Sequence, residues 1–185
     1  MSTTVKLKNV RITFPHLGAP DKFGKYSVGV LIPKNSSAHK KLLEKLREAW
    51  SDATDAYGKA LFEPNPTNAR LLRAAYIKDG DGEDAKGRPL PAWMRGYLQF
   101  GVASSKPGVV VDANLEPVSP SDPDLLYTGQ LCHVSFDLAA FNNQESHNSG
   151  FSRYLRSVVV LGGGEKIITQ SGQFTDAVGE WSEED

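Results

Sequence analysis

Basic and aromatic side chains stand close together in four segments of this sequence. The pairs and triads are Arg11 with Phe14, Lys25 with Tyr26, Arg95 with Tyr97 and Phe100, and Arg153 with Tyr154 and Arg156. A cationic side chain attracts phosphate, and an aromatic ring stacks on a planar base, which contributes roughly 1–3 kcal/mol per base. These residue types therefore indicate a surface that binds a polyanion carrying flat rings.

The alternation of side chains along a strand separates core aromatics from candidate binding aromatics. Around position 98, Tyr97 shares one face with Gln99, and Phe100 shares the other face with Leu98. We therefore expect Phe100 in the core and Tyr97 on the binding face. By the same reasoning Tyr154 and Arg156 lie on one face of their strand, opposite Arg153 and Leu155.

The predicted binding residues fall into two sets. Rings that stack on bases are Tyr26, Tyr97, Tyr154 and Phe141, and cations that meet phosphates are Lys25, Arg95, Lys106, Arg153 and Arg156. Trp93, which follows the acidic loop at 79–84, is either a further stacking residue or a loop anchor.

No local motif indicates catalysis or a metal site. Asp79, Asp81 and Glu83 resemble the start of a calcium loop, but Asp84 stands where glycine is required and Leu90 where glutamate is required. Cys132 and His133 are adjacent in a predicted strand, so their side chains point to opposite faces. We predict no catalytic residue, no metal and no cofactor.

The elements that must position these residues are mostly strands. Alternating or β-branched runs predict strands at 5–14, 25–32, 71–78, 96–103, 109–111, 130–138 and 153–161, with a polar turn at 142–150. One helix follows Ser36 or Ser37, with apolar residues at helical spacing, and fades between Tyr57 and Phe62. Strands with one inserted helix predict a mainly β protein, an OB-fold-like antiparallel barrel.

Charge divides this 185-residue chain into a basic body and an acidic end. Residues 176–185 hold five acids and no lysine or arginine; without these five, 17 acidic residues face 21 basic ones. We predict a folded domain over 1–172 and a flexible, disordered acidic tail over 173–185. The tail either competes for the basic surface and docks on a partner, or is a solubilising end. The predicted docking residues are Asp176, Glu180, Trp181, Glu183, Glu184 and Asp185.

The N-terminal segment and the cysteine content predict a cytoplasmic location. Residues 1–14 alternate and lack an apolar signal region, and no stretch approaches 18 apolar residues. The single cysteine, Cys132, fits a reducing compartment.

The ordered set of segments resembles a known family. They are KYSVGVLIPK (25–34), IKDGDGE (77–83), ASSKPGVVV (103–111), LYTGQLCHVSFDLAAFN (126–142) and GFSRYLRSVVVLGGGEKI (150–167). The resemblance is to the phage single-stranded DNA-binding proteins. It implies an OB-fold protein of the host bacterial cytoplasm that coats single-stranded DNA during replication or recombination, without catalysis. Replication or recombination proteins are the partners expected for the tail.

Two other functions remain open at the level of the sequence. One is an RNA-binding module of the same fold. The other is a phage structural accessory protein that binds no nucleic acid, although this alternative leaves the basic body and acidic tail unexplained.

Overall fold

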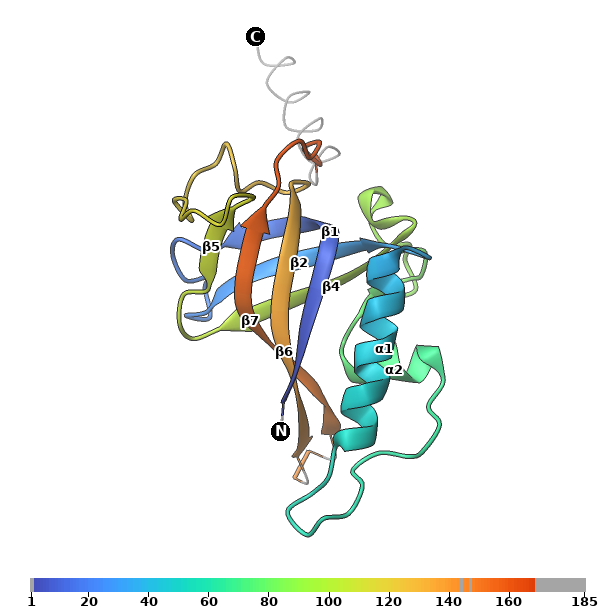
Figure 1. Ribbon diagram of the computed structural model, residues 1–185. Helices are drawn as coiled ribbons and strands as arrows, with labels where there is room; N and C mark the ends of the chain where they lie inside the picture. The colour runs from blue at the N-terminus through green and yellow to red at the C-terminus, as the bar shows by residue number, and fades with distance from the viewer. Residues whose placement is uncertain (1, 144, 147, 169–185) are drawn as a thin grey trace.

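A computed structural model describes residues 2–143, 145–146 and 148–168 (Figure 1). The strands are β1 (Ser2–His16), β2 (Tyr26–Pro33), β3 (Lys78–Asp79), β4 (Tyr97–Ser104), β5 (Val109–Asp112), β6 (Leu131–Asn143) and β7 (Asn148–Val160). The helices are α1 (Ser37–Asp52) and α2 (Asn68–Ala74), with a 3₁₀ turn at Ala92–Met94. The predicted tail and all six of its docking residues lie outside the described residues.

Five of the strands form a closed ring. The sheet order is β3-β4-β2-β1-β6-β7-β5, and an additional pairing between Ala103 of β4 and Tyr154 of β7 joins its two sides. The ring therefore runs β1-β2-β4-β7-β6 and back to β1. The prediction of a mainly β protein is confirmed. Most pairings are antiparallel, as predicted, whereas β7 pairs in parallel with both β4 and β5.

The core fills the ring through strict alternation. Cys132, Val134, Phe136 and Leu138 of β6 are buried, and the residues between them are only partly covered. Phe100 of β4 meets Phe136 edge to face at 5.4 Å between ring centroids, which confirms that Phe100 is a core residue. Burial of apolar side chains such as these is the dominant favourable contribution to folding.

The first helix begins where the sequence predicts. Ser36 caps α1, its hydroxyl accepting a hydrogen bond from the backbone N–H of His39. The buried stripe of Leu42, Leu46 and Trp50 packs toward the sheet. The helix ends at Asp52, earlier than predicted, and the chain turns so that Phe62 stacks on Trp50 at 4.4 Å.

The prediction of a strand at 71–78 is wrong, and with it the prediction of one helix. Thr67 caps a second helix, α2, its hydroxyl accepting a hydrogen bond from the backbone N–H of Arg70. Leu71 and Ala74 form the buried side of this helix. Only Lys78 and Asp79 pair as a strand, β3. The apolar residues at 71–78 fit a short buried helix as well as a strand. The helix forms because Thr67, after Pro66, caps its N-terminus. None of the helices among the described residues has the length and apolar character needed to cross a membrane.

The β6–β7 hairpin is longer than predicted. Its pairing continues to Asn143 opposite Asn148, so the predicted turn at 142–150 is mostly strand. In Figure 1 the hairpin runs on past the other strands of the ring, beside α1 and α2. Gly150 allows this approach, since a Cβ there would lie 2.4 Å from the carbonyl oxygen of Ala74.

Candidate nucleic-acid interface

Four of the nine predicted binding residues line one hollow. This hollow, of about 340 Å³, lies where β2, β4, β6 and β7 meet. Lys25, Phe141, Arg153 and Tyr154 all line it, together with Tyr76, which the sequence did not single out. We refer to the space lined by these five residues as the aromatic hollow. Residues from four distant segments of the chain thus meet in one place.

Tyr76 provides a half-exposed ring in the aromatic hollow. Its ring lies parallel to that of Phe141, with centroids 6.4 Å apart and an interplanar angle of 5°. Its hydroxyl hydrogen-bonds to the Asn148 side chain, and 49% of the residue is exposed. The backbone φ of Tyr76 is +56°, a conformation that costs free energy for a bulky residue. This backbone conformation directs the ring to the surface just after the end of α2.

Arg153 supports Tyr76 from beneath. Its guanidinium lies 5.6 Å from the centre of the Tyr76 ring and donates a hydrogen bond to the carbonyl oxygen of Ala75. Burial lowers the pKa of Arg153 from its usual value, with the Tyr76 side chain acting in the opposite direction. The charge therefore faces the hollow from a fixed, largely covered position.

Tyr154 is the most accessible predicted ring of the hollow, 50% exposed on β7. Beside it, the loop between β1 and β2 carries Lys22, Phe23 and Lys25. Asp21 shapes this loop by accepting hydrogen bonds from the backbone of Phe23 and Lys25. These bonds, with that from Lys25 first, lower the pKa of Asp21. Phe23 is 75% exposed, a further aromatic that sequence reasoning missed.

Arg156 and Lys106 lie next to Tyr154 on the surface. Tyr154 and Arg156 are exposed while Leu155 is buried, as the alternation predicted. Arg156 forms an ion pair with Asp137 of β6, its Nη1 3.0 Å from the carboxylate. Lys106 is exposed in the turn after β4, two residues before Gly108, which packs on Leu155.

A pair of glycines lies near the aromatic hollow on the outer side of β2 and β4. Gly29 pairs with Gly101 there, and two residues further along β4, Ala103 pairs with Tyr154. A Cβ on Gly101 would meet no atom within 4 Å, whereas a Cβ on Gly29 would lie 1.9 Å from the Thr13 hydroxyl. The surface is therefore open backbone at Gly101 and is covered by Thr13 at Gly29; we refer to this glycine pair as the glycine floor.

The remaining predicted residues do not join the hollow. Tyr97 and Arg95 lie at the opposite end of β4, where Tyr97 receives a hydrogen bond from Arg11 at 3.4 Å. Arg11 also donates to the carbonyl oxygen of Gly129, so its guanidinium anchors the loop that precedes β6. Tyr26 is half-buried and shares the core-facing side of β2 with Val28.

A second aromatic pair, outside the aromatic hollow, lies near the C-terminal end of β1. Phe14, 47% exposed, meets Trp93 edge to face at 5.9 Å between ring centroids. Trp93 belongs to the 3₁₀ turn before β4, so its ring fastens this loop to β1. Phe14 has a φ of +43°, which turns its side chain out of the strand's regular alternation.

The acidic loop serves the fold. Asp79 and Asp81 both pair with Lys34, and Asp81 also accepts from the backbone N–H of Gly96. The hydrogen bond from Lys34, followed by that from Gly96, lowers the pKa of Asp81, and the bonds to Asp79 and then to Asp81 raise the pKa of Lys34. Within the described part of the chain, no three His, Cys, Asp or Glu side chains gather to hold a metal. Burial raises the pKa of the Cys132 thiol to about 12.

One family model matches nearly the whole chain. It is described as "Enterobacter phage Enc34, ssDNA-binding protein" and matches residues 3–185. Among curated proteins, protein p50 of Acyrthosiphon pisum secondary endosymbiont phage 1 is 26% identical over 169 residues. That match covers 83% of this chain and 80% of p50.

Solved structures of phage proteins share the fold. The single-stranded DNA-binding protein of bacteriophage Enc34, truncated at its C-terminus, matches with a TM-score of 0.67 and 24% identity over 89% of both chains. The same protein in complex with single-stranded DNA gives 0.62 and 24%, covering 90% of both chains. Gp2.5 of bacteriophage T7, a single-stranded DNA-binding protein, gives 0.58 and 13%, covering 95% of this chain and 94% of that protein.

Proposed function

The chain belongs to the Enc34 family of phage single-stranded DNA-binding proteins, and from this premise we propose that it coats single-stranded DNA without sequence preference. The family match over residues 3–185 is the observation that carries the proposal. Binding of this kind protects exposed strands during phage DNA replication or recombination. It is a non-enzymatic function.

We propose further that the ring is an OB-fold barrel. The pairing order supports this assignment: three consecutive antiparallel strands, β1, β2 and β4, are joined to β6 on one side and to β7 on the other. OB folds bind oligonucleotides on the outer face of their second and third strands, between neighbouring loops. Here those strands are β2 and β4, the strands that carry the glycine floor.

The proposed path of the DNA follows that floor into the aromatic hollow. Bases stack on Tyr154, Tyr76 and Phe141, which line the hollow, and the exposed Phe23, two residues before Lys25, offers a further ring. Lys25 and Lys106, both exposed, supply cations for the phosphates, and Arg153 lines the hollow itself. Tyr26, Arg95 and Tyr97 lie outside this path. Stacking on rings tolerates every base, because each base has a flat face.

Binding to oligonucleotides at two salt concentrations tests the function. We expect the protein to shift a single-stranded oligonucleotide of about 20–30 nucleotides and to bind duplex of the same sequence much more weakly. Affinity should fall steeply with salt and vary little between sequences. Preference for an RNA strand of equal length would favour the RNA-binding alternative. Absence of any binding would favour a structural accessory role and refute the proposal.

We also propose that the acidic end, 173–185, works as a separate tail beside a domain at 1–172. The supporting observation is charge: five acids in the last ten residues, with no base among them, against a body of net charge +4. Such a segment competes with DNA for the basic surface and, once displaced, offers Trp181 and its neighbouring acids to a replication or recombination protein.

Removal of residues 176–185 tests the tail. We expect single-stranded DNA to bind several-fold more tightly, because a competing polyanion is lost. A matched variant with the five acids changed to Asn or Gln should reproduce this gain at full length. Trp181→Ala should leave DNA binding unchanged while weakening capture of the partner protein. Weaker DNA binding after the deletion would contradict the competition.

A further inference from the structure

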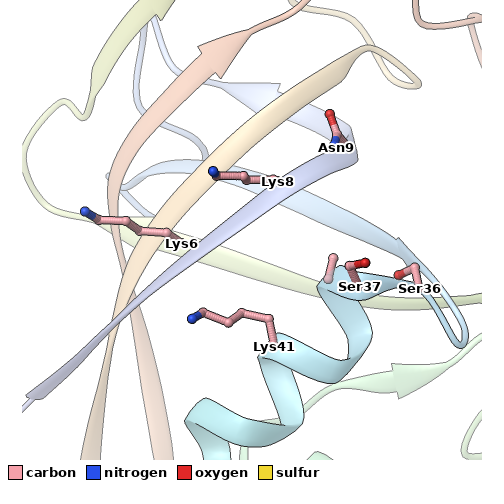
Figure 2. Close-up of a pocket in the computed structure, with 7 residues that line it drawn as sticks. Lys6, Lys8, Asn9, Ser36, Ser37 and Lys41 are labelled. Carbon is pink, nitrogen blue, oxygen red and sulfur yellow. The ribbon is translucent and has the colours of Figure 1, made fainter.

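A second and larger hollow lies between β1 and α1, on another side of the ring. It has a volume of about 530 Å³ and is lined by Lys6, Lys8 and Asn9 of β1 and by Ser36, Ser37, Ala38 and Lys41 at the start of α1. Figure 2 shows the side chains of Lys6, Lys8 and Lys41 extending toward the same side, two from the strand and one from the helix. We refer to it as the lysine hollow.

The lysine hollow has the chemistry of an anion site without base recognition. Its lining carries three amines, two hydroxyls and an amide, and none of the described residues that line it has an aromatic ring. In the described part of the chain none of the three lysines forms an ion pair, although Lys34 and Lys45 do. Three unpaired amines around one hollow repel one another, so the site favours a ligand that carries several negative charges.

A row of small polar residues connects the lysine hollow to the aromatic hollow. Lys6 of β1 pairs with Ser135 of β6, and Ser135 pairs with Ser157 of β7. The hydroxyls of the two serines bond to each other, which leaves a low floor. Arg156 stands beside Ser157 on β7, and Tyr154 lies two residues further along that strand. Short side chains flanked by Arg156 thus join the two hollows across the outer side of β6.

We infer that the lysine hollow is a second DNA contact, which receives only the phosphates of a strand that has already filled the aromatic hollow. This inference rests on the proposed function and adds the course of the DNA. The strand leaves Tyr154, crosses the serine row of β7 and β6, and reaches Lys6, Lys8 and Lys41. The protein therefore binds DNA bases at the aromatic hollow and DNA phosphates at the lysine hollow. A long DNA strand wraps around the ring of β-strands.

The continuity of the surface favours a nucleic acid over an acidic peptide as the ligand. A peptide site would not need to connect with Tyr154 and Arg156, whereas a strand held at both hollows must cross the surface between them. The absence of rings in the lysine hollow fits phosphate contacts that position a strand without reading its bases.

Oligonucleotide length separates the two contacts. The test protein is the full chain with Lys6→Gln, Lys8→Gln and Lys41→Gln, and the matched control carries Lys40→Gln, Lys59→Gln and Lys86→Gln, three exposed lysines outside both hollows. Binding is measured by fluorescence anisotropy with oligo-dT of about 8 and about 30 nucleotides over a range of salt.

We expect the triple variant to bind the long strand roughly tenfold more weakly at low salt, with a salt dependence smaller by about two units of log–log slope. Its affinity for the short strand should match the wild type, which also shows that the variant is folded. Equal losses on both lengths, or no loss on the long strand beyond that of the control, would overturn the inference. Failure of the wild type to bind either length would instead refute the proposed function.

Discussion

The aromatic hollow and the lysine hollow show how one ring of strands can present two different binding chemistries. The first brings together Tyr76, Phe141 and Tyr154 beside the glycine floor. The second has three lysines and, among the residues that the structure describes, no ring. The rings supply contact energy that does not depend on salt, and the amines supply energy that salt weakens.

The two hollows also differ in how their residues are held. Tyr76 is fixed by a strained backbone, a hydrogen bond to Asn148 and the guanidinium of Arg153. The lysines of the other hollow are exposed, Lys6 and Lys41 on regular secondary structure and Lys8 beside the register shift of β1 at Asn9. A preorganised ring loses little conformational entropy on binding, whereas a lysine amine needs only to come near a phosphate.

Removal of rings from the aromatic hollow should have the largest effect. We expect Tyr154→Ala and Tyr76→Ala each to weaken binding of single-stranded DNA by about 1–3 kcal/mol, or roughly 5- to 150-fold. The salt dependence should stay the same, because no charge is removed. Titration of a short oligo-dT at several salt concentrations measures both quantities.

Tyr57→Ala is the matched control for the tyrosine variants. Tyr57 is 89% exposed in the loop after α1, outside both hollows, so its removal should leave DNA binding unchanged. Tyr154→Ala tests DNA stacking more directly than Tyr76→Ala, because Tyr76 also contacts the side chains of Asn148 and Arg153 within the protein. An unchanged affinity in Tyr154→Ala would remove the aromatic hollow from the binding path.

A side chain added to the glycine floor should have a smaller effect, of about tenfold. In Gly101→Val the new Cβ meets no atom within 4 Å, so the fold should keep or slightly gain stability, as valine suits a strand better than glycine. The branched side chain would still stand in the proposed path of the strand. We expect weaker binding of short oligo-dT with an unchanged thermal midpoint.

Gly29→Val provides the contrast on the facing strand. There a Cβ would lie 1.9 Å from the Thr13 hydroxyl, so this variant should lose stability as well as affinity. Tight binding by a stable Gly101→Val protein would show that the DNA does not cross the floor.

The sequence predicts the elements of the ring better than the composition of either hollow. Period-2 alternation shows that Phe100 is buried and that Tyr154 and Arg156 are exposed, because those facts depend only on neighbours along one strand. Closure of the ring depends on Ala103 meeting Tyr154, 51 positions later in the sequence. No local pattern encodes that contact.

The residues that the sequence missed lie where local rules fail. The predicted strand at 71–78 contains Tyr76, but the chain there is the last part of α2 and the turn after it, and the exposed ring depends on a positive φ. Phe23 lies in a loop shaped by Asp21, and loop aromatics carry no periodic signal. Lys6, Lys8 and Lys41 cannot be grouped from the sequence, since nothing in it places the start of α1 beside β1.

The smallest predicted effect is a pH dependence of stability that arises from two histidines near β1 and α1. The Nδ1 atoms of His133 and His39 accept backbone N–H bonds from Asn9 at 3.1 Å and Asn35 at 2.9 Å. Burial first, then Lys8 for His133 and Lys34 for His39, lowers each pKa below its ordinary value of 6.5. Among the described residues, none that lines the aromatic hollow is a histidine.

Because both folded pKa values lie below the unfolded value, the unfolded chain binds protons first as the pH falls through about 6.5. Stability is therefore complete above that pH and decreases below it, until the folded pKa values are reached. Urea unfolding at about pH 7.5 and pH 5.5 should show a lower midpoint at the acidic pH. Asp21, Asp81 and Asp84 do not contribute there, since their pKa values are lowered from 3.8. The double variant His39→Gln and His133→Gln keeps an acceptor for each N–H and should flatten the dependence, whereas a variant with the same pH dependence as the wild type would assign it to other groups.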